Sequence, residues 1–122
     1  VGHVMDFMAT FIDLAHANYP KEWNGHSITP LEGLSLKPIF EGKIRKGHTA
    51  LFNEHVGGRS VRLEDWKLVS RDNDTTWYLY KISGDKTELN DLSQKYPGKV
   101  KEMDKMWREW AHRVQVYPMP SK

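Results

Sequence analysis

Adjacent Glu54 and His55, followed by Arg59, are the side chains of this sequence whose types and spacing could do chemistry. A carboxylate beside an imidazole suits general acid and base catalysis, and a guanidinium suits the binding of anions. Consecutive residues of a strand point to opposite sides, however, so Glu54 and His55 would form a weak acid/base pair. The stretch 57–71, GGRSVRLEDWKLVSR, alternates basic with apolar residues. That pattern fits a basic binding surface, a strand edge that carries catalytic residues, or a hairpin with one solvent-exposed face.

Other signatures of catalysis are absent from the sequence. Its histidines never form the zinc-binding pattern HExxH, and it lacks a phosphate-binding loop, a dinucleotide glycine fingerprint and a serine nucleophile elbow. The pair Asp72-Asn73 lies between two expected strands, so we interpret it as a turn and not as a metal site. The sequence therefore predicts no catalytic and no metal-binding residue within this chain.

Composition narrows the class of protein. The chain has 122 residues, a formal net charge of +2 and no cysteine. This length is typical of a single domain with one hydrophobic core. No apolar run reaches the roughly 20 residues of a membrane-spanning helix. The absence of cysteine excludes disulfides, thiolate zinc sites and a cysteine nucleophile, and so small a charge is weak for a nucleic-acid-binding protein. Because the sequence begins at Val1 without Met, we expect a piece of a longer protein.

An amphipathic helix is predicted over residues 3–17, where apolar residues recur at helical spacing. Asp6, Thr10 and Asp13 lie away from its apolar side. That side is formed by Val4, Phe7, Met8, Phe11, Leu14 and Ala15.

Residues 18–49 hold several prolines and glycines, which predict an irregular connector with a short helical turn near residues 34–40. Strand signals then fill residues 50–82. The pair Glu64-Asp65 separates two alternating runs, and residues 72–74 separate the next two. These turns predict an antiparallel meander of three or four strands.

The middle strand of this meander indicates which face of the sheet is exposed to solvent. Trp66 and Leu68 point to one side, whereas Lys67 and Val69 point to the other. Because antiparallel sheets commonly cover one face and expose the other, we interpret the basic residues mainly as the solvated face.

A second amphipathic helix is predicted over residues 96–114, with Pro97 in its first turn. Its apolar stripe is Val100, Met103, Trp107, Trp110 and Val114. Acidic residues dilute the basic ones between them, so packing across the sheet is favoured over binding to calmodulin or a membrane. The predicted fold class is α+β: an antiparallel sheet of about four strands with a packed C-terminal helix, preceded by an N-terminal helix and the connector.

Several spaced motifs occur in a set order along the chain. The pattern His-x-x-Asp-x-x-x-Thr and a Leu-x-Gly-x-Ser-Leu connector are followed by Glu-His-x-Gly-x-x-x-x-Arg, a Trp-Lys-Leu strand and a Leu-Tyr segment that ends near Asn-x-Leu. The residues concerned are His3, Asp6, Thr10, Leu31, Gly33, Ser35, Leu36, Glu54, His55, Gly57, Arg62, Trp66, Lys67, Leu68, Leu79, Tyr80, Asp85, Glu88, Asn90 and Leu92. Taken together, this order resembles the C-terminal portion of arylsulfatase-type sulfatases, within the alkaline-phosphatase-like superfamily.

The sequence departs from the family pattern at three places. Ala9 stands where the family helix has Pro, and Asp91 separates Asn90 from Leu92. Glu64 occupies a turn position where the family often has Gly, which bears on the geometry of that hairpin.

The resemblance implies a sulfuric ester hydrolase as the parent protein, with calcium and a formylglycine made from a Cys/Ser-x-Pro-x-Arg motif. This sequence has no Cys and no Ser followed two places on by Pro, so we expect no cofactor in this fragment and no activity from it alone. The resemblance also implies that residues 1–49 are a helix and connector belonging to the large catalytic domain. Residues 50–122 would be the small C-terminal subdomain. Export of the parent to the periplasm or beyond the cell is implied as well.

The resemblance makes the stretch 57–71 a scaffold hairpin and places Glu54, His55 and Arg59 where they could face the substrate cleft of the intact enzyme. The expected partners are the rest of the parent chain and its sulfated substrate, and neither a nucleic acid nor a membrane is expected. Residues 3–17 would lose their cover without the large domain, so self-association through this helix is a further expectation.

Two rival functions would use the basic residues differently. An anionic-glycan-binding module would use Arg59, Arg62, Lys67 and Arg71 beside Trp66 or Trp77. A nucleic-acid-binding module would stack bases on the same aromatic residues. Both require exposed aromatic rings, whereas the scaffold interpretation requires most of them to be buried.

Overall fold

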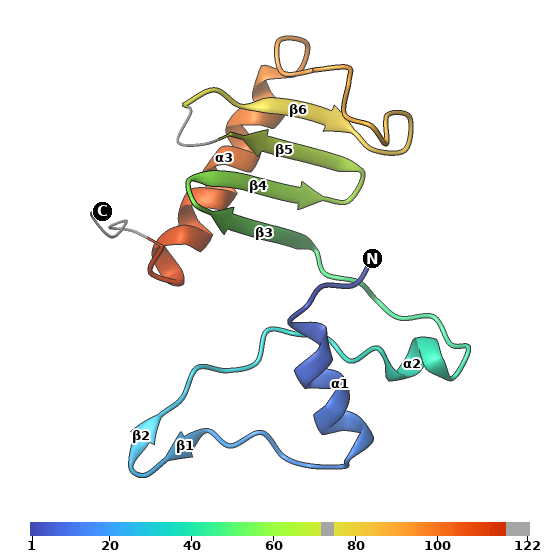
Figure 1. The fold of residues 1–122 in the computed structure, drawn as a ribbon, viewed down its shortest axis with the longest axis vertical. Coiled ribbons are helices and arrows are strands. Elements are labelled where there is room, and N and C mark those ends of the chain that lie inside the picture. Colours follow the sequence, from blue (N-terminus) through green and yellow to red (C-terminus); the bar gives the residue numbers. More distant parts are fainter. Residues whose placement is uncertain (72–74, 117–122) are drawn as a thin grey trace. The chain divides into compact units, whose positions relative to one another are not determined.

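The computed structural model describes residues 1–71 and 75–116. The chain divides into two compact units, Val1–His48 and Thr49–Lys122, each with its own secondary structure (Figure 1). An N-terminal helix, a four-stranded antiparallel sheet and a C-terminal helix are all present. The predicted α+β class is therefore confirmed.

Helices α1, Asp6–Leu14, and α2, Lys37–Phe40, belong to the first unit. α1 is shorter than the helix predicted over 3–17, because the chain leaves helical geometry after Ala15 and His16 has a φ of 51°. α2 corresponds to the short helical turn expected near 34–40. Pro38 stands in its first turn, where a proline leaves no helical hydrogen bond unmade.

A small hairpin in the connector is not predicted by the sequence pattern. β1, Glu22–Trp23, pairs antiparallel with β2, His26–Ser27. Asn24 and Gly25 join them with φ angles of 50° and 77°, the left-handed pair of a two-residue hairpin turn. Strands of two residues are too short to show an alternating pattern, so the Asn-Gly pair is their one sequence signal.

α1 turns its polar side toward the connector and its apolar side toward solvent. Asp6 and Thr10 are buried, whereas Phe7 and Phe11 are 54% and 63% exposed. The exposed side is called the apolar stripe below and consists of Val4, Phe7, Met8, Phe11 and Leu14. Within the described residues of the first unit, α1 is therefore held by polar contacts and its stripe is left uncovered.

The second unit is built on an antiparallel meander in the order β3-β4-β5-β6 (Figure 1). Its strands are β3 Ala50–His55, β4 Gly58–Leu63, β5 Trp66–Ser70 and β6 Tyr78–Lys81. Two-residue turns, Val56-Gly57 and Glu64-Asp65, connect the first three strands. The turn expected at Asp72-Asn73-Asp74 lies outside the described residues.

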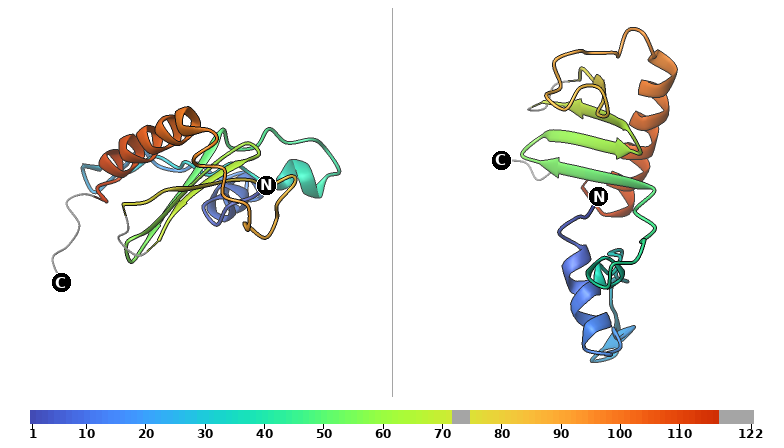
Figure 2. Two further views of the ribbon diagram at one scale, coloured as in Figure 1. Left: turned by 90° about the horizontal axis from the view of Figure 1, so that it is seen from above. Right: turned by 90° about the vertical axis from the view of Figure 1, so that its right-hand side faces the viewer.

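α3, Pro97–Arg113, lies across one face of the sheet, as Figure 2 shows. The core beneath it is made of Val61, Leu68, Leu79, Met103, Trp107 and Ala111, all fully buried. The ring of Trp110 is partly buried and stacks on Phe52 with ring centroids 5.4 Å apart. Four residues of the predicted stripe, Val100, Met103, Trp107 and Trp110, therefore pack on the sheet. Val114 lies beyond the end of α3 and is 38% exposed.

Within the described residues of the second unit, no helix lies on the other face of the sheet, which is called the open face below (Figure 2). Because strand residues alternate, Lys67 and Val69 of β5 point to this face, while Trp66 and Leu68 point to the helix. No helix within the described ranges is both long and apolar enough to cross a membrane.

Candidate functional site

The hairpin between β3 and β4 carries the three residues singled out from the sequence. Glu54 stands opposite Arg59, and His55 stands opposite Gly58. The Gly57 backbone N–H donates to Oε1 of Glu54 over 2.8 Å, which fixes the turn. The hairpin therefore holds Glu54 and Arg59 as a facing pair.

His55 lies on the other side of the sheet from Glu54 and Arg59, since neighbouring strand residues alternate. Its side chain is exposed, and it borders a hollow on the open face. The structure thus brings two of the three candidate residues into register and separates the third. An acid/base pair of Glu54 with His55 is not formed.

Arg59 is held among aromatic rings on the helix side. Its guanidinium carbon lies 4.7 Å from the ring centroid of Trp77 and 5.2 Å from that of Trp107. One guanidinium nitrogen donates to Oγ of Ser70 over 2.9 Å. Cation–π contacts of this kind stabilise a desolvated cation, so Arg59 ties the hairpin to the core.

A hollow of about 310 Å³ lies on the open face of the sheet. It is lined by Asn53, His55, Gly58, Arg59, Ser60, Lys67, Val69, Ser70 and Arg71. None of these residues is acidic. Lys67 and Arg71 bring cationic side chains to this face, whereas the Arg59 guanidinium points to the helix side. Lys67 forms an ion pair with Glu88, which lies outside the lining. Arg71 packs its guanidinium over the ring of Tyr78, 5.6 Å from its centroid.

The aromatic and basic residues proposed for a glycan- or nucleic-acid-binding module do not form one surface. Trp66 and Trp77 pack against the core under α3, whereas Lys67 and Arg62 face away from it in the alternating register. Of the basic residues named for such a module, Arg59 is the one that lies over the ring of Trp77. The open face therefore offers charged and polar groups without a tryptophan platform.

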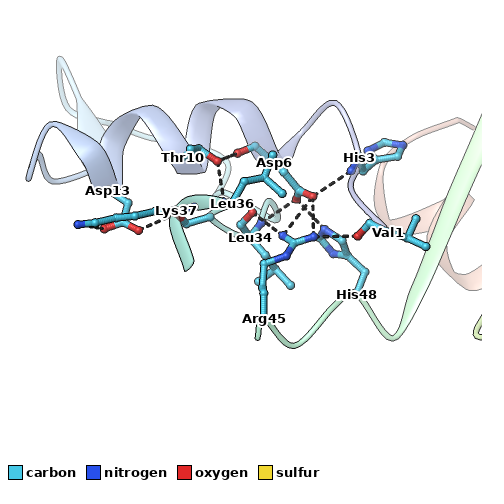
Figure 3. A network of polar contacts seen from close by, with 11 residues as sticks. Val1, His3, Asp6, Thr10, Asp13, Leu34, Leu36, Lys37, Arg45 and His48 are labelled. Carbon is cyan, nitrogen blue, oxygen red and sulfur yellow. Dashed lines mark hydrogen bonds and ion pairs between the residues drawn. The ribbon is translucent and has the colours of Figure 1, made fainter. Parts of the chain in front are cut away.

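A second polar cluster, in the first unit, surrounds the fully buried carboxylate of Asp6 (Figure 3). Nε2 of His48 lies 2.6 Å from one carboxylate oxygen, and the Arg45 guanidinium lies 3.3 Å from the other. The backbone N–H groups of Leu34 and His3 donate over 2.8 and 2.9 Å. We call Asp6, Arg45 and His48, with these two N–H groups, the Asp6 cluster.

Thr10 and Asp13 continue the same side of α1 (Figure 3). The Thr10 hydroxyl donates to the Asp6 carbonyl over 2.6 Å and accepts from the Leu36 backbone N–H over 2.9 Å. Asp13 accepts from the Ser35 hydroxyl over 2.6 Å. Sequence reasoning placed Asp6, Thr10 and Asp13 away from the apolar stripe but missed the burial of Asp6 and Thr10. The signal that could have found it was their spacing along one side of the helix.

The electrostatics of Asp6 follow from its burial and its donors. Burial by itself would raise the pKa of this carboxyl. The backbone N–H groups of Leu34 and His3, and then His48, outweigh that effect and hold the pKa far below its usual range. Asp6 is therefore ionised throughout the physiological range, and its role is to bind chain segments together.

The Asp6 cluster is suited to structure and not to reaction. Its carboxylate oxygens are occupied by donors from the chain itself, which leaves no position for a substrate atom. Across residues 1–71 and 75–116, no three His, Cys, Asp or Glu side chains gather so that they could hold a metal ion. The calcium implied by the family resemblance therefore does not fit the residues described.

The chain is similar in sequence to two curated sulfatases. The chain is 31% identical over 120 residues to an N-acetylglucosamine-6-O-sulfatase of Bacteroides thetaiotaomicron, covering 86% of this chain and 20% of that protein. It is 26% identical over 123 residues to an uncharacterized sulfatase of Schizosaccharomyces pombe, covering 96% of this chain and 22% of that protein. No protein-family model matches the chain.

The fold is found in solved structures as well. A 2-O GAG sulfatase superposes with a TM-score of 0.69 at 23% sequence identity, covering 95% of this chain and 26% of that one. The chain spans about a fifth of the length of the curated relatives, 20% and 22%. The matches therefore cover most of this chain but only 20% to 26% of each of these relatives.

Proposed function

Since this chain belongs to the sulfatases, we propose that it forms the C-terminal supporting part of a sulfuric ester hydrolase, with the reacting groups on the remainder of a longer protein. The observation that carries the proposal is the coverage: 86% and 96% of this chain match sulfatases, yet only 20% and 22% of their length is represented. Within this part, α3 and the sheet act as scaffold.

The formylglycine and calcium of such an enzyme have no counterpart among the residues here. The sequence lacks Cys, and none of its serines precedes Pro at the required spacing. These groups are therefore assigned to the parent, and no catalytic step is derived from this chain's residues.

The division of labour between the two units is part of the proposal. Residues 1–49 would belong to the large catalytic domain, and residues 50–122 would form the small C-terminal subdomain. Supporting this, α1 buries its polar side in the Asp6 cluster and exposes the apolar stripe. A stripe of this kind rarely stays bare in a soluble protein, so the remainder of the parent chain is its natural cover. Self-association of the isolated chain through the stripe is expected when that cover is missing.

The β3–β4 hairpin is proposed as a wall of the substrate cleft. His55 is the exposed member and would contact substrate directly. Glu54 fixes the turn through the Gly57 N–H, and Arg59 anchors the hairpin between Trp77 and Trp107. A sulfated sugar is the proposed substrate class, because one relative is an N-acetylglucosamine-6-O-sulfatase.

The test uses the longer coding sequence. It is expected to encode a Cys/Ser-x-Pro-x-Arg motif upstream, and the purified enzyme is expected to release sulfate from a sulfated sugar. His55→Ala should lower kcat/KM about tenfold, the loss of one good polar contact of roughly 1.4 kcal/mol. The matched control is Lys101→Ala, an exposed position of α3, which should leave kcat/KM unchanged. An unchanged kcat/KM for His55→Ala would remove the cleft-wall role, and a parent without the motif would overturn the proposed enzyme.

A further inference from the structure

The hollow on the open face shares His55 with the proposed cleft wall and extends beyond it across β4 and β5. Its central row crosses the sheet through paired residues, Asn53 with Ser60 and Ser60 with Val69. Asn53 and Ser60 offer an amide and a hydroxyl, and Val69 is a small apolar surface beside them. The row therefore carries no charge. Asn53 and Ser60 can form hydrogen bonds with a ligand, and Val69 offers a small apolar surface next to them.

Cationic side chains flank Val69 along the chain, at one end of this row. Lys67 lies two residues before Val69 in the sequence and Arg71 lies two residues after it. Both line the hollow. At a strand rise of about 3.3 Å per residue their backbones are about 13 Å apart. Each charged group also has its own partner, Glu88 for Lys67 and the ring of Tyr78 for Arg71, so the two are not gathered around one small anion. The spacing instead fits a ligand with anionic groups separated by one or two sugar rings.

We propose that the open-face hollow binds a short anionic saccharide, with its acidic groups directed to Lys67 and Arg71 and its hydroxyls directed to Asn53 and Ser60. The choice of a sulfated saccharide rests on the proposed function. Gly58, which pairs with His55 two residues along the strand from Ser60, has no side chain to fill that side of the hollow. The volume of about 310 Å³ suits a ligand of this size.

A nucleic acid is a poorer occupant of the same hollow. Single strands bind by stacking bases on exposed aromatic rings. Trp66, Trp77 and Trp110 instead pack against the core on the opposite face. The ring of Tyr78 is partly buried and has the Arg71 guanidinium over it. The open face therefore matches hydroxyl and acidic groups better than it matches a run of bases.

The test is a titration of the 122-residue chain with a heparin tetrasaccharide, followed by amide chemical shifts in NMR. Shifts are expected at Asn53, Ser60 and Val69. Lys67→Gln and Arg71→Gln should each weaken binding about threefold, and the double variant about tenfold. Lys101→Gln, which removes an exposed lysine from α3, should leave the affinity unchanged. Unaltered amide shifts outside the hollow would show that each variant remains folded.

Three results would overturn this proposal. One is equal binding of the fully desulfated tetrasaccharide or of inorganic sulfate alone. Another is tighter binding of an oligodeoxythymidine of similar charge. The third is the same loss of affinity in Lys101→Gln as in the double variant. Because neither Lys67 nor Arg71 belongs to the proposed cleft wall, tetrasaccharide binding can succeed while His55→Ala leaves parent activity unchanged, which separates the two proposals.

Discussion

Nε2 of His48 lies 2.6 Å from Oδ1 of Asp6 although 42 positions separate the two residues. Both side chains are almost wholly buried, at 9% and 0% exposed. The contact joins the first turn of α1 to the end of the connector. The first unit is therefore closed around an ionised carboxylate and not around an apolar centre.

Asp6→Asn should open this unit locally. The change leaves Arg45 buried without its counter-charge, and removing one partner of a buried ion pair costs about 3 kcal/mol or more. Amide hydrogen exchange across residues 6–14 is expected to speed up by a factor of about 100, which corresponds to roughly 3 kcal/mol. Asp13→Asn, a more exposed carboxylate on the same side of α1, is the control and should change exchange far less. Equal effects of the two variants would refute a special role for Asp6.

Acid should loosen α1 for the same reason. The pKa of the Asp6 carboxyl is lowered in the folded chain, so its contribution to stability is complete above the unfolded value of about 3.9. The contribution is then lost as the pH falls from that value toward the folded pKa. Hydrogen exchange of α1 measured from pH 6 down to pH 2.5 should therefore show a loss of protection that begins near pH 4. In Asp6→Asn this pH-dependent loss should be reduced.

Trp107→Ala should destabilise the second unit most. The Trp107 ring is fully buried in the core, and its Nε1–H donates to the Asn53 carbonyl over 3.0 Å. Truncation should lower the free energy of unfolding by about 3 to 5 kcal/mol, as for other large core aromatic residues. Urea unfolding followed by far-ultraviolet circular dichroism measures this. Trp23→Ala removes a ring that is 68% exposed, and a comparable loss there would contradict the assignment of the core.

Glu64→Gly should stabilise the hairpin between β4 and β5. Glu64 has a φ of 52°, in the left-handed region where a Cβ atom is disfavoured. Replacement by Gly relieves that strain, which outweighs the opposing increase in the entropy of the unfolded chain, and the expected net gain in stability is about 0.5 to 1 kcal/mol. Glu64→Ala keeps a Cβ atom and should bring no such gain. A gain in the Ala variant as large as in the Gly variant would show that the Glu side chain, and not the backbone, is responsible.

The second unit was largely predictable because its signals are local. Glu64-Asp65 marks a turn between two alternating runs, and Pro97 precedes an apolar stripe of helical period. The alternation of residues also places Lys67 and Val69 together on one face, which is the open face of the sheet. What alternation could not give is the lateral pairing of Asn53 with Ser60 and Val69, which creates the hollow.

The first unit was less predictable because its contacts are distant in sequence. An apolar stripe on a helix ordinarily faces the core, yet α1 buries Asp6 and Thr10 instead. Their partners, Leu34, Arg45 and His48, come from the connector, where no periodic pattern exists. The sequence motif His-x-x-Asp-x-x-x-Thr marked these positions through the family resemblance but did not indicate burial or charge pairing.

Sulfate release by the purified 122-residue chain, assayed on an aryl sulfate and on a sulfated N-acetylglucosamine beside the longer enzyme, tests the central claim most directly. We expect no turnover by this chain and turnover by the longer enzyme, because the nucleophile and the metal site are assigned to the remainder of that protein. Sulfate release by the 122-residue chain alone would contradict the account.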